Sequence, residues 1–173
     1  GRVPALEIEG ERMFESLAIM EYLCERFPEA GLGCGVNDPD RMAFLTWLHF
    51  AETVSQHVAA LTQQHILLRE DWMRSSTVMR LEAKRLEKCY AAIEARLSTP
   101  IENRDYLLTS GFSAADIATG QAVWLGRHFM PTDAFPEVTK GLARLMEREG
   151  FQKSLPAEGE PVIYDRDYPM PEA

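Results

Sequence analysis

The stretch GRVPALEIEGERMFESLAIMEYL, residues 1–23, decides how this chain begins to fold. Val3 stands before Pro4, a step that favours extended backbone and the start of a strand. A glycine-containing turn then leads to a second short strand. Glu15 and Ser16 follow, where an apolar pattern of helical spacing begins. The stretch therefore predicts a strand, a turn, a second strand and a helix in immediate succession.

Helical patterns fill most of the remaining chain. Pro28 ends the first helix, which we place at residues 15–27. Residues 31–38 are rich in Gly, Asn and Asp and are typical of a linker. Asp38 is expected to cap the next helix, with Pro39 in its first turn. Later helices are predicted over residues 39–69, 77–97 and 135–149, with one more beginning after Ser113.

Ser113 and Asp116 have the spacing of a capping box, in which each side chain bonds the backbone amide of the other residue. An acidic side chain in a helix could also serve in acid-base chemistry. The fixed relation to Ser113 favours the structural role for Asp116. We therefore predict this pair as a structural cap.

Composition narrows the classes of function. The chain has 173 residues, 46% of them hydrophobic, and a formal net charge of −9. This acidity argues against a nucleic acid or an anionic membrane as partner, because both attract clustered Lys and Arg. The sequence has neither a secretory signal nor an apolar run long enough to span a bilayer. We therefore expect a cytoplasmic protein. Three widely spaced cysteines, Cys24, Cys34 and Cys89, predict free thiols.

Three histidines recur at intervals of eight residues: His49, His57 and His65. This interval turns each side chain about 80° around a helix relative to the one before. They do not converge as metal ligands at i and i+4 would. We predict no metal site, and we interpret His57 as an imidazole on the helix surface or facing a dimer partner.

Three motifs in this order and spacing resemble the cytosolic glutathione S-transferases of bacteria. They are GRVPALEIEG…FESLAIMEYLCERFP, DRMAFLTWLHFAE and YLLTSGFSAADIATGQAVWLGRHF. The resemblance covers nearly the whole chain. It implies that the first strand, helix and strand of the family's N-terminal domain are absent here. The fold class it implies is mainly α: a partial thioredoxin-like ββα unit followed by the all-α C-terminal bundle of the family.

The implied domain organisation has four parts. Residues 1–30 would form the partial thioredoxin-like, glutathione-binding domain, and residues 31–38 the linker. Residues 39–155 would form the all-helical C-terminal domain. Residues 156–173 would form an extended tail over the surface.

The resemblance assigns glutathione binding to Val3, Pro4, Glu15 and Ser16. In the family a cis-proline corresponds to Pro4, and the main chain of the preceding residue pairs with the cysteinyl part of glutathione. Residues corresponding to Glu15 and Ser16 hold the γ-glutamyl group. The chemistry suits them, because a helix N-terminus attracts a carboxylate and an acidic side chain attracts an ammonium group. For an isolated Glu-Ser pair, a simple helix cap beside a solvated acid is the alternative.

The implied activity is conjugation of glutathione thiolate to small hydrophobic electrophiles, as in detoxification. Glutathione would be the co-substrate, and a homodimer the assembly. The resemblance places the group that activates the thiol in the absent segment, so no catalytic residue can be named and the chain as given is expected to be inactive. The alternative is a non-catalytic, glutathione-transferase-like helical interaction module.

Overall fold

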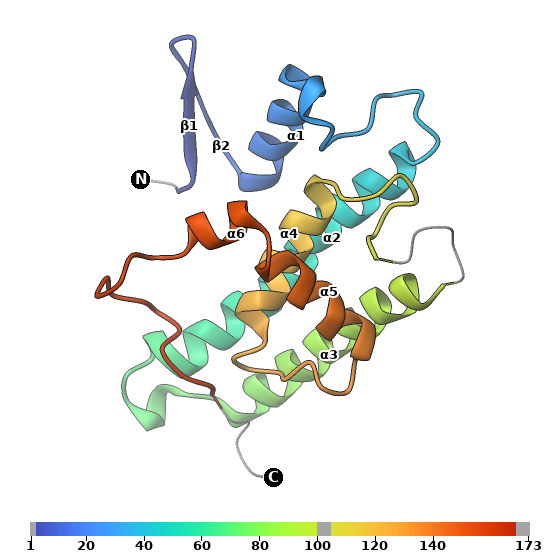
Figure 1. The fold of residues 1–173 in the computed structure, drawn as a ribbon. Helices are drawn as coiled ribbons and strands as arrows, with labels where there is room; N and C mark the ends of the chain where they lie inside the picture. The colour runs from blue at the N-terminus through green and yellow to red at the C-terminus, as the bar shows by residue number, and fades with distance from the viewer. Residues whose placement is uncertain (1–2, 100–104, 169–173) are drawn as a thin grey trace.

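A computed structural model of the chain describes residues 3–99 and 105–168. A two-stranded hairpin and a helix form one end of the molecule, and the remaining helices pack beside one another (Figure 1). Within the described residues, none of the helices combines the length and the apolarity that crossing a bilayer requires. The main elements are β1 (Ala5–Ile8), β2 (Glu11–Phe14), α1 (Ser16–Arg26), α2 (Arg41–Thr62), α3 (Ser76–Ser98), α4 (Ala114–Gly126), α5 (Pro136–Met146) and α6 (Glu149–Ser154). Short helical turns are η1 (Pro28–Ala30), η2 (Gln63–Leu67) and η3 (Asp71–Met73).

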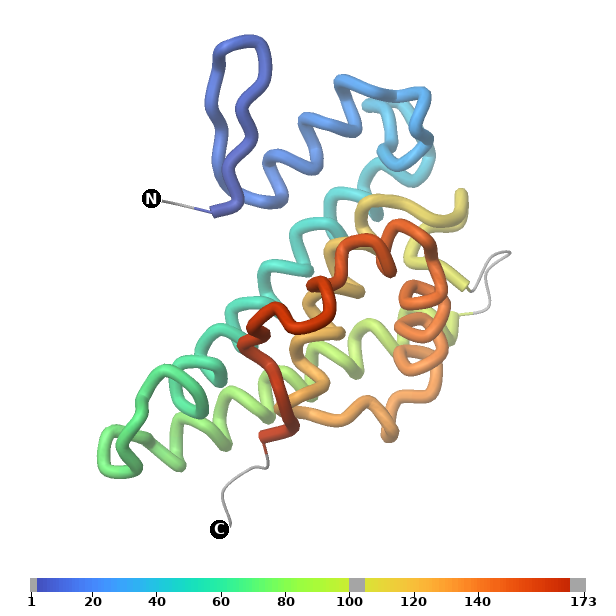
Figure 2. The backbone as a smooth tube through the Cα atoms, turned by 60° about the vertical axis from the view of Figure 1, so that its left-hand side comes forward, coloured from blue at the N-terminus to red at the C-terminus, as the bar shows by residue number. Residues whose placement is uncertain are grey.

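The hairpin follows the pattern predicted for the first residues. β1 and β2 are antiparallel, with Ala5 opposite Phe14. Glu9 and Gly10 form the connection, with φ of 52° and 82°. Positive φ at both central positions is the conformation that suits the twist of a two-residue hairpin. Neither strand contributes a buried residue, and Figure 2 shows the hairpin standing beside α1, clear of the bundle.

The core lies among α2, α3 and α4, with α5 packed over it. α4 approaches closely because of Gly126, where any side chain would collide with the Tyr90 hydroxyl of α3. On α2 the buried residues recur at intervals of three and four, so one face of the helix turns inward. They are Phe44, Leu48, Ala51, Val54, Val58 and Leu61.

The long helix begins later than predicted. α2 starts at Arg41, with Asp40 in the position before it, so the predicted cap at Asp38 is wrong. The Asp38 carboxylate instead accepts a hydrogen bond from the Gly35 amide within the preceding turn. Asp40 does not cap the helix with its side chain, because its carboxylate accepts from the amide of Ser110 at 2.7 Å. These contacts outside the helix override the local capping preference.

The long helix also ends earlier than predicted, since regular α-helix stops at Thr62 and the wider turn η2 follows. The amide of Leu68 closes η2 by donating to the Gln63 carbonyl at 3.0 Å. Arg74 holds the end of the turn, with its Nε 2.9 Å from the Leu68 carbonyl. Neither glycine nor proline occurs where the helix stops. The Arg74 side chain from the following loop fixes this position instead.

The helix predicted over residues 135–149 corresponds to α5, which ends at Met146, and a separate short helix, α6, begins at Glu149. The first amides of α5 receive no cap from their own neighbours. Instead the Glu94 carboxylate of α3 accepts from the amides of Glu137 and Val138 at 2.9 and 3.0 Å. A carboxylate from one helix therefore caps the N-terminus of another, where the helix dipole favours negative charge.

Replacing Glu94 with alanine is expected to lower the free energy of unfolding by about 1–2 kcal/mol, because two helix amides lose a charged acceptor. Chemical denaturation followed by circular dichroism measures this change. The control is Glu87→Ala, an exposed acid on the same helix, which should cost within about 0.5 kcal/mol. Equal effects of both substitutions would argue against the cap.

Beyond α6, residues 155–168 contain neither helix nor strand, and Tyr168 is buried near the far end of the bundle. The domain boundaries stay a prediction. Residues 1–2 of the predicted first domain and residues 169–173 of the predicted tail lie outside the described residues.

Candidate functional site

The strongest candidate site is the corner where β2 passes into α1. Glu15 occupies the position before the helix with φ 77° and ψ 104°, a left-handed backbone conformation that is uncommon for a residue with a side chain. The first intrahelical hydrogen bond runs from the Ile19 amide to the Glu15 carbonyl, at 2.9 Å. The amides before Ile19, beginning at Ser16, have no acceptor within the helix. The Glu15 side chain makes no capping hydrogen bond to this end of α1.

The hairpin register brings the predicted residues to this corner. Because Ala5 pairs with Phe14, the residues just before β1 lie beside those just after β2. Val3 and Pro4 therefore neighbour Glu15, and the Val3–Pro4 peptide bond is cis. Val3 is 92% exposed. All four predicted residues, Val3, Pro4, Glu15 and Ser16, are exposed to solvent.

A groove of about 870 Å³ opens next to the start of α1. Three α1 residues, Ser16, Leu17 and Met20, line its near side. Glu52 and Ser55 of α2 and Phe151 of α6 contribute to the other walls. Of the predicted residues only Ser16 lines this groove. The volume lies within the range of small-molecule sites, and the lining combines apolar and polar side chains as such sites do.

The sequence interpretation missed Glu52 and Ser55. They lie beside the buried face of α2, and no local spacing connects them with residue 16. Their only sequence signal is their polarity next to the apolar residues of that face.

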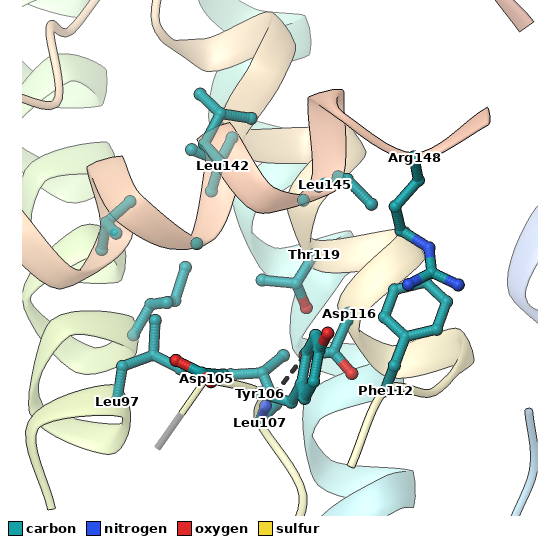
Figure 3. A pocket seen from close by; sticks show the side chains of 15 residues that line it. Leu97, Asp105, Tyr106, Leu107, Phe112, Asp116, Thr119, Leu142, Leu145 and Arg148 are labelled. Carbon is teal, nitrogen blue, oxygen red and sulfur yellow. Dashed lines mark hydrogen bonds between the residues drawn. The ribbon is translucent and has the colours of Figure 1, made fainter. Parts of the chain in front are cut away.

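A second cavity, among α3, α4 and α5, has a volume of only about 50 Å³. Figure 3 shows Asp116 at its edge, bonded to the Leu107 backbone, and the Arg148 guanidinium lying over the Phe112 ring. The space is far below the several hundred Å³ of typical ligand pockets. It can accommodate at most one or two water molecules. This cavity is therefore a packing feature of the bundle.

Ser113 and Asp116 form a capping box at the start of α4. The Ser113 amide donates to Asp116 Oδ2 at 2.9 Å, and the Leu107 amide donates to Oδ1 at 2.8 Å. Burial raises the pKa of Asp116, while these hydrogen bonds act in the opposite direction. Both carboxylate oxygens are thus engaged by the backbone.

His57 does not lie on the helix surface as interpreted from the sequence. Its side chain is 12% exposed, and Nδ1 lies 2.7 Å from Glu82 Oε2 on α3. Glu82 also accepts from Arg85 at 2.5 Å. The pair joins α2 to α3 within the bundle. Among residues 3–99 and 105–168, no group of three or more His, Cys, Asp or Glu side chains could hold a metal ion.

Two family models match the sequence: "Glutathione S-transferase, N-terminal domain" over residues 1–31 and "Glutathione S-transferase, C-terminal domain" over residues 67–149. The chain belongs to the glutathione S-transferase family. A glutathione S-transferase-like protein from Aspergillus aculeatus is 29% identical over an alignment of 171 residues, which covers 94% of this chain and 76% of that protein.

Glutathione S-transferase structures have the same fold. One from Methylobacillus flagellatus, with GSH bound, has a TM-score of 0.76 at 24% identity and covers 90% of this chain and 76% of its own. Ure2p5 from Phanerochaete chrysosporium, cocrystallised with 1-(S-glutathionyl)-2,4-dinitrobenzene, has a TM-score of 0.73 at 18% identity, with coverages of 88% and 73%. The predicted fold class, a small ββα unit followed by the all-α bundle of this family, is confirmed.

Proposed function

We propose that the chain binds glutathione at the start of α1 and takes part in conjugating its thiolate to small hydrophobic electrophiles. The observation that carries this proposal is the corner itself. It combines the α1 N-terminus, a cis-proline, and an acid in a left-handed conformation, next to a groove of about 870 Å³. The structure of the M. flagellatus family member with GSH bound supports the choice of ligand.

The two ends of the γ-glutamyl group fit the two residues at this corner. Its carboxylate would accept hydrogen bonds from the first amides of α1 and from the Ser16 hydroxyl, where the helix dipole adds attraction. Its ammonium group would pair with the Glu15 carboxylate. The exposed main chain of Val3 would bond the cysteinyl part.

The groove would receive the electrophile. Leu17 and Met20 from α1 and Phe151 from α6 supply apolar surface. An electrophile there would lie beside glutathione, because Ser16 belongs both to the groove and to the proposed glutathione site. The adduct found with Ure2p5 supports an aromatic electrophile as a probe. Detoxification in the cytoplasm would be the physiological setting.

We also propose a homodimer as the assembly. Apolar side chains at the surface support this proposal, including Met42 of α2, which is 81% exposed, and Phe14 of β2, which is 50% exposed. Sedimentation at several concentrations would test it.

One observation favours the non-catalytic helical module as a second candidate. The core cluster contains buried residues from Cys34 to Tyr168 and none from β1 or β2. The helical part therefore has a core of its own, as an interaction module requires.

Calorimetric titration with reduced glutathione, together with a conjugation assay using 1-chloro-2,4-dinitrobenzene, tests the proposal. Binding with turnover above the uncatalysed rate would support the enzyme. Binding without turnover would favour the module. A folded chain that does not bind glutathione would contradict the proposed site.

A further inference from the structure

The chain after α6 crosses the molecule and is anchored far from the candidate site. We call residues 155–168 the strap. Figures 1 and 2 show it running from α6 toward the end of the bundle where α2 passes into α3, opposite the hairpin. The strap starts directly after α6, and Phe151 of this helix lines the groove.

Two tyrosines attach the strap to the end of α4 and to the end of α2. Tyr164 stacks on His128, with ring centroids 5.7 Å apart, and its hydroxyl lies 2.8 Å from Thr62 Oγ1. Tyr168 is 7% exposed and stacks on Phe129 at 5.3 Å. The Tyr168 amide also donates to the His128 carbonyl at 2.7 Å. These contacts make a specific aromatic anchor for a segment that has no helix or strand.

His65 of η2 completes this anchor from the bundle side. Its ring lies 5.5 Å from the Phe129 ring and 5.8 Å from the Tyr168 ring, between centroids. Its Nε2 is buried and has no hydrogen-bond partner among the described residues. The His65 residue is partly exposed, but a proton on Nε2 would find no acceptor among the described residues, so this packing favours the neutral ring.

Charged groups around His65 reinforce this preference. Burial lowers the pKa of His65 below its ordinary value of 6.5, and Arg74 in the loop after η2 lowers it further. On the strap, Arg166 lies over the Tyr168 ring at 5.4 Å, which adds a second positive charge on that side. At the end of α4, His128 is paired with Asp167 of the strap at 3.1 Å. This contact attaches the strap at a second point, whereas a proton on His65 would weaken attachment at the first.

We propose that the strap is an acid-sensitive latch in which a proton on His65 releases Tyr164 and Tyr168 from the bundle and frees α6 at the edge of the groove. The released strap leaves His65 open to water, where it takes up a proton more readily than in the closed anchor. Attachment is therefore complete above pH 6.5 and weakens as the pH falls toward the lowered pKa of His65.

Release of the strap would affect the groove through α6. This helix has only six residues, and its Phe151 contacts the Trp124 ring of α4 edge to face at 5.7 Å. Without the strap, one end of α6 loses its tether. The inference concerns the fold and does not depend on glutathione binding.

Hydrogen exchange measured by mass spectrometry on the full chain at about pH 7.5 and about pH 5.5 tests the latch, after correction for the intrinsic exchange rate. We expect protection of residues 149–168 to fall several-fold at the lower pH, while α3 stays protected. Equal protection of residues 149–168 at both values would overturn the proposal.

Two variants identify the responsible histidine. His65→Phe places an aromatic ring that cannot be protonated in the same position, so residues 149–168 should stay protected at both pH values. In His128→Gln the acid response should persist. The proposal fails if His65→Phe keeps the response or if His128→Gln abolishes it.

Should His65→Phe fail to fold, Tyr164→Phe provides an independent test. It removes the hydrogen bond to Thr62 and leaves His65 in place. We expect several-fold lower protection of residues 149–168 at about pH 7.5 and a loosening that begins at higher pH than in the unchanged protein. Unchanged protection across that range would count against the latch.

Discussion

Replacing Ser16 with alanine is expected to weaken glutathione binding about tenfold to a hundredfold. The proposed role of the hydroxyl is to donate to the γ-glutamyl carboxylate, and a hydrogen bond to a charged group contributes about 1.5–3 kcal/mol. Calorimetric titration of each variant with glutathione measures the change. Ser16→Thr, which keeps a hydroxyl, should restore much of the affinity.

The same substitution should leave the fold intact, which separates a binding role from a structural one. Ser16 is the first residue of α1 and follows the N-cap position, which Glu15 occupies, and alanine is a good helix former. The free energy of unfolding should therefore change by no more than about 0.5 kcal/mol. Ser98→Ala, at the exposed end of α3, is the matched control for affinity. An affinity that Ser16→Ala and Glu15→Gln both leave unchanged would refute the assignment of these residues.

Replacing Asp116 with alanine is expected to lower the free energy of unfolding by about 2–4 kcal/mol. The substitution removes the cap of α4 and leaves the amides of Leu107 and Ser113, both in buried residues, without their acceptor. Asp116→Asn should cost less, because one oxygen can still accept. Equilibrium denaturation by urea measures both effects.

Asp133→Ala, at an exposed position after α4, is the control and should be nearly neutral. A cost for Asp116→Ala below about 0.5 kcal/mol would mean that the capping box contributes little. Such a result would also reopen a chemical role for Asp116, which the sequence interpretation set aside.

The elements that sequence predicts well are those fixed by nearby residues. The hairpin follows from the Val3–Pro4 step and the glycine-containing turn. The start of α4 follows from Ser113 and Asp116, whose spacing matches the observed capping box. In both places the stabilising partners lie within a few residues, so the pattern contains the information.

The elements that sequence predicts poorly are fixed by distant residues. Asp40 is engaged by Ser110 across the fold, so α2 begins after it without a side-chain cap. Glu94 caps α5 from another helix, which no local pattern reveals. The aromatic anchor of the strap joins segments more than 90 residues apart, as the Thr62–Tyr164 contact illustrates.

The candidate site also has one part that the sequence predicts and one part that depends on distant residues. Glu15 and Ser16 are adjacent in sequence, and the resemblance of the motif around them is what proposed them. The groove beside them is built from α1, α2, α4 and α6. Its walls at Glu52, Ser55 and Phe151 become apparent only when those helices are packed together.

The central claim is that glutathione is held at the start of α1. The most direct measurement is the change in backbone amide NMR shifts as reduced glutathione is added. The account predicts that the largest changes occur at Ser16, Leu17 and Ala18, with little change at the distant strap anchor around Tyr168. Unchanged shifts at the first turn of α1, with binding detected elsewhere in the chain, would contradict it.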